Sequence, residues 1–264
     1  MKAVILAAGL CKRIRQVTGG RPKCLLQVGR RTILDYQLES LFKAGINSVA
    51  IVVGYGKEHI INHIAERRPD KLPAITFIEN PQFAFTNNIY SLWLAQEWVG
   101  GADFLCLNAD VLFHPQIILP AITTQADISV IIDEEWRDET MKVIIKDSKV
   151  LAMSKAIPRE QFSGTYVNIT TFSRRICRPF FGAMDSLITQ GRVNDFFNVA
   201  VEQLIADGVT VSFTQTNGLP WAEVDDPSDL YFARTNVYPK LVGQSAFGQG
   251  IGRRETQLKI AARS

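Results

Sequence analysis

The first residues of the chain form a short apolar segment that stops at small residues and opens into a basic loop. Lys2–Gly9 reads KAVILAAG, and Lys12, Arg13, Arg21 and Lys23 follow it. Small residues let backbone N–H groups come close to a phosphate chain, and the cations can neutralise it. The pattern predicts a strand followed by a phosphate-binding loop, typical of enzymes that handle a nucleoside triphosphate. It matches neither G-x-x-x-x-G-K-[ST] nor the G-x-G-x-x-G of dinucleotide-binding folds.

A bacterial lipoprotein signal is an alternative for the same segment, because Leu10-Cys11 follows the apolar run. The run is short, however, and Lys2 is the only lysine before it. We therefore expect a cytoplasmic protein that retains the loop. A mature chain starting at Cys11 on N-terminal sequencing would remove the proposed site.

Composition limits the class of protein. The chain has 264 residues, 47% hydrophobic and 21% charged, which is enough for one large α/β domain with a sizeable core. No apolar run approaches the roughly 20 residues that cross a bilayer, so we expect no membrane insertion. A net charge of +3 is too small to indicate a nucleic-acid partner. The cysteines are far apart without a C-x-x-C pattern, which argues against structural zinc and favours reduced thiols.

Apolar strands alternate with amphipathic helices in the first half of the chain. Strands are expected at Val4–Leu6, Val49–Val53, Ile75–Ile78 and Asp103–Leu107. Helices are expected at Ile33–Lys43, Lys57–Arg67 and Asn88–Trp98. Such alternation predicts a parallel sheet covered on both faces, with ligands at the carboxyl ends of its strands.

The second half has shorter strands. They are expected at Val130–Asp133, Met141–Ile145, Lys149–Ser154, Tyr166–Phe172, 209–213 and Trp221–Asp225. Helices are expected at Phe180–Thr189, Asp195–Ala206 and from Pro227. With no clear linker, we expect one domain over 1–240, with a nucleotide-binding half over about 1–128 and an acceptor-binding half over 129–240. The basic tail over 241–264 is expected to be mobile or to form an oligomer arm.

Two acids stand directly after predicted strands. Asp110 follows one strand and Asp225 ends another. Two carboxylates that meet from distant parts of the sequence suit a Mg²⁺ ion bound to substrate phosphates. Asp225 could instead be a surface acid beside a helix that Asp226 caps ahead of Pro227, and Asp110 could be a turn former. We favour the metal role because both acids fall where strands of this architecture deliver ligands.

Amides and lysines offer further polar groups. Asn87, Asn88 and Ser91 open a helix; one Asn can cap it, and the others can contact a base or a ribose. Lys142 and Lys155 lie on strand-like segments, where they could be solvated or could hold an acceptor's phosphate. No Ser/His/Asp or Cys/His set stands out, so covalent catalysis is not indicated.

Several of these motifs together resemble those of the sugar-phosphate nucleotidylyltransferases, over roughly residues 1–235. The matching motifs are Leu6-Ala7-Ala8-Gly9, Arg13, Pro22-Lys23, Val53-Gly54-Tyr55, Asn108-Ala109-Asp110 and Glu223-Val224-Asp225. The resemblance implies a Rossmann-like α/β fold with a mixed, mostly parallel sheet flanked by helices.

A second set of motifs is similar to the branch with bacterial phosphocholine and phosphonate cytidylyltransferases. It comprises Asn87-Asn88-Ile89-Tyr90-Ser91-Leu92, Met141-Lys142-Val143, Ser154-Lys155 and Gly164-Thr165-Tyr166. One departure concerns Cys11, which stands at the second glycine of the family's Gly-x-Gly-x-Arg loop. A side chain there could narrow the triphosphate path or require another loop conformation.

The resemblance implies roles for the residues that match. Leu6, Ala7, Ala8 and Gly9 would hold the nucleotide by backbone contacts, and Arg13 and Lys23 would bind its phosphates. The remaining roles fall to Asn87, Asn88 and Ser91 for the nucleoside or acceptor, Asp110 and Asp225 for Mg²⁺, and Lys142 and Lys155 for the acceptor's phosphate or phosphonate. Lys23, Asp110, Lys142 and Asp225 would then be the catalytic set.

The far end of the acceptor has more than one candidate partner. A quaternary ammonium group favours aromatic faces, and Trp136, Tyr166 and Trp221 could form a cage with Glu223 or Asp195 as counter-charge. A primary amine would favour the carboxylates. Tyr166 and Trp221 could also simply fill the core.

We therefore expect a cytidylyltransferase that moves CMP from CTP to a small phosphorylated or phosphonate headgroup, of the phosphocholine or 2-aminoethylphosphonate type, and releases pyrophosphate. The protein could be a homo-oligomer. A sugar-1-phosphate nucleotidylyltransferase using another triphosphate and a non-catalytic nucleotide sensor are the alternatives. A dinucleotide reductase is disfavoured, because its glycine fingerprint is absent.

Overall fold

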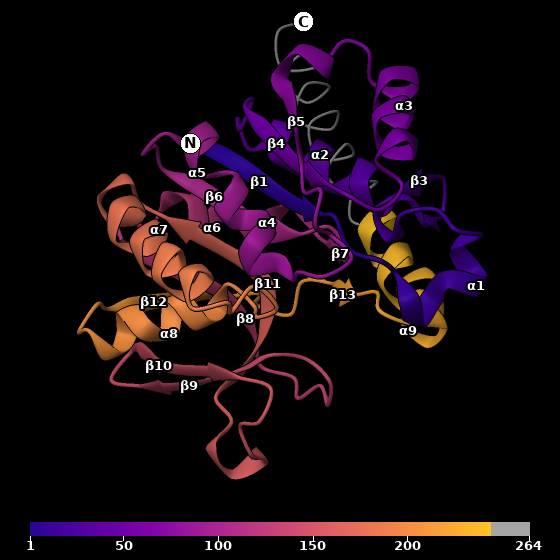
Figure 1. Ribbon diagram of the computed structural model, residues 1–264. Coiled ribbons are helices and arrows are strands. Elements are labelled where there is room, and N and C mark those ends of the chain that lie inside the picture. Colours follow the sequence, from indigo (N-terminus) through magenta and orange to yellow (C-terminus); the bar gives the residue numbers. More distant parts are fainter. Residues whose placement is uncertain (244–264) are drawn as a thin grey trace, which may run out of the picture.

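A nine-stranded sheet with the order β5-β4-β1-β6-β11-β8-β12-β10-β9 forms the centre of the protein (Figure 1). The computed structural model describes residues 1–243, so almost all of the predicted tail over 241–264 lies outside the described residues. The strands of the sheet are β1 (Lys2–Ala7), β4 (Val49–Val53), β5 (Ile75–Glu79), β6 (Phe104–Asn108), β8 (Ile128–Asp133), β9 (Lys142–Lys146), β10 (Lys149–Ser154), β11 (Gly164–Phe172) and β12 (Val211–Gln215).

Strand direction differs between the two parts of this sheet. β5, β4, β1 and β6 are parallel, so their carboxyl ends share one edge. β11 is antiparallel to both β6 and β8, β12 is parallel to β8, and the β9–β10 hairpin completes the sheet. The expected mixed α/β fold is confirmed, and strands from both halves of the chain belong to one sheet.

Helices cover both faces of the sheet (Figure 1). Most buried apolar residues of α2 (Ile33–Lys43), α3 (Lys57–Arg67) and α6 (Ile118–Thr123) belong to one buried cluster. Those of α4 (Asn88–Leu94), α7 (Arg174–Thr189) and α8 (Asn198–Ala206) belong to another on the opposite face. The sheet is therefore the middle layer of three, as continuous apolar strands require.

Two small sheets and three short helices complete the fold. The sheets pair β2 (Gln27–Val28) with β3 (Arg31–Thr32), and β7 (Val111–Phe113) with β13 (Trp221–Glu223). The helices are α1 (Arg15–Thr18), α5 (Gln96–Val99) and α9 (Pro227–Phe232). β13 is shorter than the expected strand Trp221–Asp225, and it pairs with β7 rather than with the main sheet.

Local sequence explains most of the helix bounds. α2 begins after Thr32, which forms a reciprocal capping box with Asp35. The helix expected over Asn88–Trp98 is interrupted at Ala95 into α4 and α5. α7 begins at Arg174, six residues before the expected Phe180, because its buried apolar stripe already includes Ile176 and Cys177; Pro179 lies within the helix.

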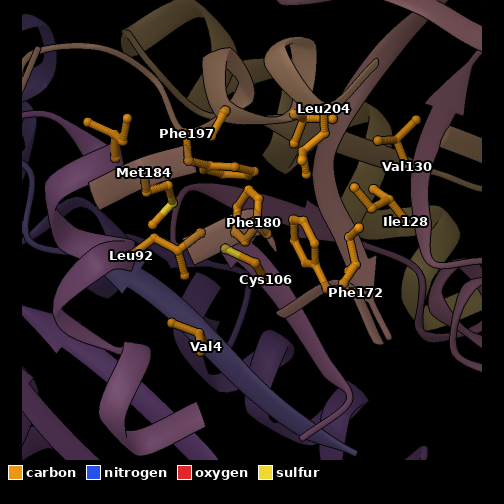
Figure 2. Close-up of a cluster of buried hydrophobic side chains, with 14 of the residues drawn as sticks. Val4, Leu92, Cys106, Ile128, Val130, Phe172, Phe180, Met184, Phe197 and Leu204 are labelled. Atoms are coloured by element: carbon orange, nitrogen blue, oxygen red, sulfur yellow. The ribbon is translucent and has the colours of Figure 1, made fainter. Parts of the chain in front are cut away.

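We expect Phe172→Ala to lower the free energy of unfolding by about 3–5 kcal/mol, because it leaves a cavity in a packed aromatic cluster. Phe172 stacks on Phe104 and Phe180, with ring centroids 4.7 and 4.3 Å apart. Figure 2 shows Phe172 beside Phe180 in this buried cluster. Urea denaturation measures the change. Phe85, which is 78% exposed, provides the matched control. A loss for Phe172→Ala no larger than that for Phe85→Ala would contradict this packing.

Candidate active site

The carboxyl edge of the parallel strands opens into a cavity of about 420 Å³, here called the loop cavity. Ala8-Gly9 follow β1 at this edge, and Ala109-Asp110 follow β6. The lining residues come from these strand ends, the basic loop, the start of α4 and the chain after β13: Leu6, Ala7, Gly9, Leu10, Cys11, Lys12, Arg13, Lys23, Cys24, Asn87, Ala109, Asp110 and Asp225. The structure thus brings the predicted phosphate loop and the two predicted acids to one hollow.

The pairing of β7 with β13 brings Asp110 and Asp225 together. Glu223 lies opposite Val111, and the Val224 N–H donates to the Asp110 carbonyl at 3.0 Å. The chain after β13 therefore passes directly beside the chain after β6. Two acids more than a hundred residues apart in sequence meet because of this small antiparallel pair.

Lys23 lies between the two acids. Its Nζ donates to Asp110 Oδ2 at 2.9 Å and to Asp225 Oδ1 at 2.5 Å, while Arg13 Nη2 lies 2.6 Å from Asp225 Oδ2. Burial alone would lower the pKa of Lys23, but the two carboxylates raise it above its usual value. Lys23 is therefore a fixed positive charge at the centre of the site.

The acids of this site can accommodate a hard divalent cation. Carboxylate oxygens of Asp110, Glu223 and Asp225 lie within 4.8 Å of one another. Asp110 Oδ1 is buried and has no hydrogen-bond partner among residues 1–243. Oxygen ligands with an unused lone pair are the donor set that Mg²⁺ binds. In this structure the ammonium group of Lys23 supplies the positive charge between Asp110 and Asp225.

The sequence did not lead us to expect Glu223 next to Asp110 and Asp225. It was expected as a counter-charge for the acceptor, and the structure puts it beside the two aspartates. Residues two apart on a strand face the same side, and Glu223 stands two before Asp225. That spacing is the signal that could have identified the third acid.

We expect the stability of the metal-free protein to decrease as pH rises through the range set by Glu223. Burial, with the nearby Asp110 and Asp225 carboxylates, raises the pKa of Glu223 from 4.5 to about 8. Between these pH values the folded protein retains a proton that the unfolded chain has lost, so the free energy of unfolding falls with pH. Urea denaturation across this range should show a flatter dependence for Glu223→Gln. Identical profiles for the two proteins would count against this environment.

A smaller cavity of about 200 Å³, the central cavity, adjoins the loop cavity. The two share Leu6, Gly9, Arg13, Asn87, Asp110 and Asp225. The central cavity is also lined by Ala8, Asn80, Phe83, Thr86, Asn88, Ser91, Asn108, Lys155, Phe196 and Glu223. It therefore joins the acids to the polar start of α4.

The polar groups of α4 are partly committed to local hydrogen bonds. Asn87 Oδ1 accepts from the Asn88 N–H at 2.8 Å, and Asn88 Oδ1 accepts from the Phe197 N–H at 2.8 Å. Ser91 Oγ accepts from Asn80 Nδ2 at 3.0 Å. The amide Nδ2 groups of Asn87 and Asn88 make no hydrogen bond within residues 1–243, so they are available to a ligand.

The two predicted lysines lie in different surroundings. Lys155 lines the central cavity and is exposed. Lys142 is buried on β9, where its Nζ donates to the Asp138 carbonyl and lies 4.6 Å from the centroid of the Trp136 ring. Lys142 lines none of the cavities described here, so the structure does not bring it to the acids. We therefore drop the catalytic and acceptor roles expected for it.

The predicted aromatic cage is not assembled. Tyr166 is 1% exposed, and its hydroxyl is 2.6 Å from Thr170 Oγ1 in the core. Trp221 is 2% exposed, and the Arg137 guanidinium lies 4.0 Å from its ring centroid. Trp136 packs edge-on against Phe162. The two buried rings are core residues, the alternative left open for them.

Asp195 and Arg21 also lie away from the places expected for them. Asp195 forms an ion pair with Arg192 at 2.6 Å and lines neither the loop cavity nor the central cavity. Arg21 lines a separate hollow rather than the loop cavity. We therefore withdraw the counter-charge role of Asp195 and the triphosphate contact of Arg21.

Cys11 adopts the backbone conformation that its place in the loop demands. Its φ of 54° lies in the left-handed region, which glycine occupies without strain. Its Sγ accepts a hydrogen bond from the Lys23 N–H at 3.1 Å. The side chain thus links the loop to the segment that carries Lys23.

A third cavity of about 410 Å³, the acidic cavity, adjoins the central one through Glu223 and Asp225. Its other lining residues are Glu135, Arg137, Asp138, Glu139, Thr140, Asp226, Asp229 and Phe232. Carboxylates far outnumber cations among them, and Glu139 lies 2.8 Å from Arg13 Nη1. Such a lining favours a positively charged group.

Comparison with known proteins identifies the family. Residues 3–164 match the MobA-like NTP transferase domain. The chain belongs to that family. It is therefore a nucleotidyltransferase of the superfamily that the sequence motifs resemble. Within residues 1–243, no helix is both long and apolar enough to cross a membrane.

Two curated relatives are cytidylyltransferases. The CTP:phosphoglutamine cytidylyltransferase of Campylobacter jejuni is 24% identical over 253 residues, 87% of this chain and 98% of the relative. The choline-phosphate cytidylyltransferase of Streptococcus pneumoniae is 34% identical over 157 residues, 56% of this chain and 65% of the relative. Among solved structures, the inositol-1-phosphate CTP transferase of T. maritima has the same fold, with a TM-score of 0.77 at 20% identity, covering 91% of this chain and 94% of that one.

Proposed function

We propose that this nucleotidyltransferase is a CTP-dependent cytidylyltransferase. It would transfer CMP to a small phosphorylated or phosphonate acceptor that carries a positive charge at its other end, and release pyrophosphate. The observation that carries the proposal is the acidic cavity that continues from the Asp110–Asp225 pair. A sugar phosphate has no cation to place there, whereas an amine or ammonium headgroup does.

The donor nucleotide would lie over the end of β1. The loop cavity is lined by Leu6, Ala7 and Gly9, and by the cations Arg13 and Lys23. Backbone N–H groups and cations together suit a triphosphate. The free amides of Asn87 and Asn88 would face the nucleoside or the acceptor from the central cavity.

The reaction would be an in-line attack by an acceptor oxygen on the α-phosphorus of CTP. That oxygen is already anionic, so no strong general base is required, and positioning and charge neutralisation dominate. Lys23 and Arg13 would stabilise the negative charge of the departing pyrophosphate. Mg²⁺ held by Asp110 and Asp225 would neutralise the phosphates when bound.

The acceptor would be held at both ends. Lys155 on the wall of the central cavity would pair with its phosphate or phosphonate. Glu223 faces both the central and the acidic cavity. The carboxylates of the acidic cavity would receive the amine, and the added positive charge would favour ionisation of Glu223. Trp136 is half-buried and lines none of the three cavities. An ammonium contact with it would share the ring with Lys142 Nζ, which lies 4.6 Å from the ring centroid.

A matrix of nucleotides and acceptors tests the proposal. CTP, UTP, dTTP and GTP are each combined with phosphocholine, phosphoethanolamine, 2-aminoethylphosphonate, phosphoglutamine and several sugar phosphates, and pyrophosphate release is measured. We expect turnover with CTP and an amine-bearing acceptor, reduced by Glu223→Gln mainly through KM for the acceptor. Turnover confined to sugar phosphates with another triphosphate would instead support the sugar-1-phosphate alternative.

A further inference from the structure

A second polar hollow, here called the arginine hollow, lies apart from the three cavities of the active site. Its volume is about 440 Å³, close to the 420 Å³ of the loop cavity. It is built from residues 21–32, the first turn of α2 and one side of α3. The lining residues are Arg21, Leu25, Gln27, Arg30, Arg31, Thr32, Asp35, His59, Asn62, His63, Glu66 and Arg67.

The charges around this hollow do not balance. Its lining carries the four arginines Arg21, Arg30, Arg31 and Arg67, and the two acids Asp35 and Glu66. Arg31 forms an ion pair with Glu39. Within residues 1–243, the other three guanidinium groups form no ion pair with any acid.

Asp35 cannot neutralise the three unpaired arginines, because its oxygens are already engaged. Oδ2 accepts from the Thr32 N–H at 3.0 Å and from Thr32 Oγ1 at 2.9 Å. Oδ1 lies 3.2 Å from His63 Nε2 and 3.6 Å from Arg68 Nε. Desolvation opposes ionisation of this carboxyl, but the bonds from His63 and Thr32 outweigh it and hold the pKa of Asp35 well below its usual range. Asp35 is thus an internal anchor of α2.

Unpaired guanidinium groups around a concave surface repel one another and focus a positive potential into the hollow. A planar guanidinium fork matches two phosphoryl oxygens at once, which makes arginine the usual residue for phosphate recognition. The three groups also come from separate segments, since Arg21 and Arg30 flank the β2 strand and Arg67 ends α3. A ligand that paired with all three would bridge these segments.

We propose that the arginine hollow binds a small phosphorylated anion of diphosphate size, at a site separate from the catalytic one. The hollow is as large as the loop cavity that is proposed to take the triphosphate of CTP. Because Glu66 also lines the hollow, the three unpaired guanidinium groups leave an excess of two positive charges, which a ligand with at least two negative charges would match. The shared ligand chemistry is a diphosphate group, either free or as part of a nucleotide.

Binding of inorganic pyrophosphate in metal-free buffer, measured by isothermal titration calorimetry, tests this site. Lys23→Met removes the cation at the centre of the catalytic site, although Arg13 remains there. Binding that persists in this variant and depends on Arg30 and Arg67 therefore reports on the hollow. We expect Lys23→Met to retain one equivalent of pyrophosphate. Adding Arg30→Ala and Arg67→Ala should weaken that binding at least about tenfold, as expected for the loss of two charge-assisted contacts.

The matched control adds Arg174→Ala and Arg178→Ala to Lys23→Met instead. Both are exposed arginines on α7 without an ion pair in the described part of the chain, so net charge changes equally and binding should persist. Titration with CDP in place of pyrophosphate tells whether the hollow binds a nucleotide or only free diphosphate. Weaker binding of either ligand after Arg30→Ala and Arg67→Ala supports the site. Absence of binding to Lys23→Met, or equal weakening by the control pair, overturns it.

Discussion

Asp110→Ala is expected to lower kcat by about a thousandfold, the scale seen when an electrostatic contact to a developing charge is lost. The substitution removes one of the two carboxylates proposed to hold Mg²⁺, including the buried Oδ1 without a partner in residues 1–243. Lys23 would remain anchored by Asp225 at 2.5 Å, so the fold should survive. Steady-state pyrophosphate release at saturating Mg²⁺ measures the effect.

Asp207→Ala is the control for this substitution, because Asp207 is an exposed acid at the end of α8. It should leave kcat unchanged. Thermal denaturation of both variants checks that the fold is intact. Near-normal turnover of Asp110→Ala would refute the assignment of this carboxylate.

Lys23→Met should lower kcat/KM for CTP by about a hundredfold or more, because it removes a fixed cation aimed at the phosphates. Metal-free Lys23→Met should also unfold at a lower temperature than the wild type, since Asp110 and Asp225 would face each other without the ammonium group that now bonds to both. Added Mg²⁺ should restore more stability to the variant than to the wild type.

Lys12→Met provides the matched comparison in the same loop. Lys12 lines the loop cavity, but within the described residues it makes no ion pair. Its loss should therefore change kcat/KM far less and leave metal-free stability unaltered. Equal effects of the two substitutions on both measurements would show that Lys23 has no special place in the site.

The sheet and the location of the acids could be predicted because local patterns determine them. Apolar strands that alternate with helices specify a parallel sheet, and parallel strands place their carboxyl ends at one edge. Gly9 and Asp110 follow such strands, so their arrival at one cavity was foreseeable. The expected bounds of α2, α3, β4 and β10 agree with the structure, since caps, glycines and turns mark them in the sequence.

The remaining features depend on tertiary pairings that no local pattern encodes. Glu223 joins the aspartates because β13 pairs with β7 outside the main sheet. Lys142 lies away from the acids because it is the first residue of β9. This strand pairs with both β10 and β11, and Lys142 is buried there. Arg21 lines another hollow, and the adjacent Pro22 packs closely against Gly56, where an added Cβ would approach the proline ring to 2.9 Å.

A crystal structure with CTP and Mn²⁺ in place of Mg²⁺ would be decisive, because anomalous scattering locates the metal independently of the protein. We predict one anomalous peak coordinated directly by Asp110 and Asp225 and by phosphate oxygens of a nucleotide that lies over Gly9. Lys23 should then have moved from the acids to the phosphates. A nucleotide bound elsewhere, or a metal that touches neither aspartate, would contradict the proposed catalytic site.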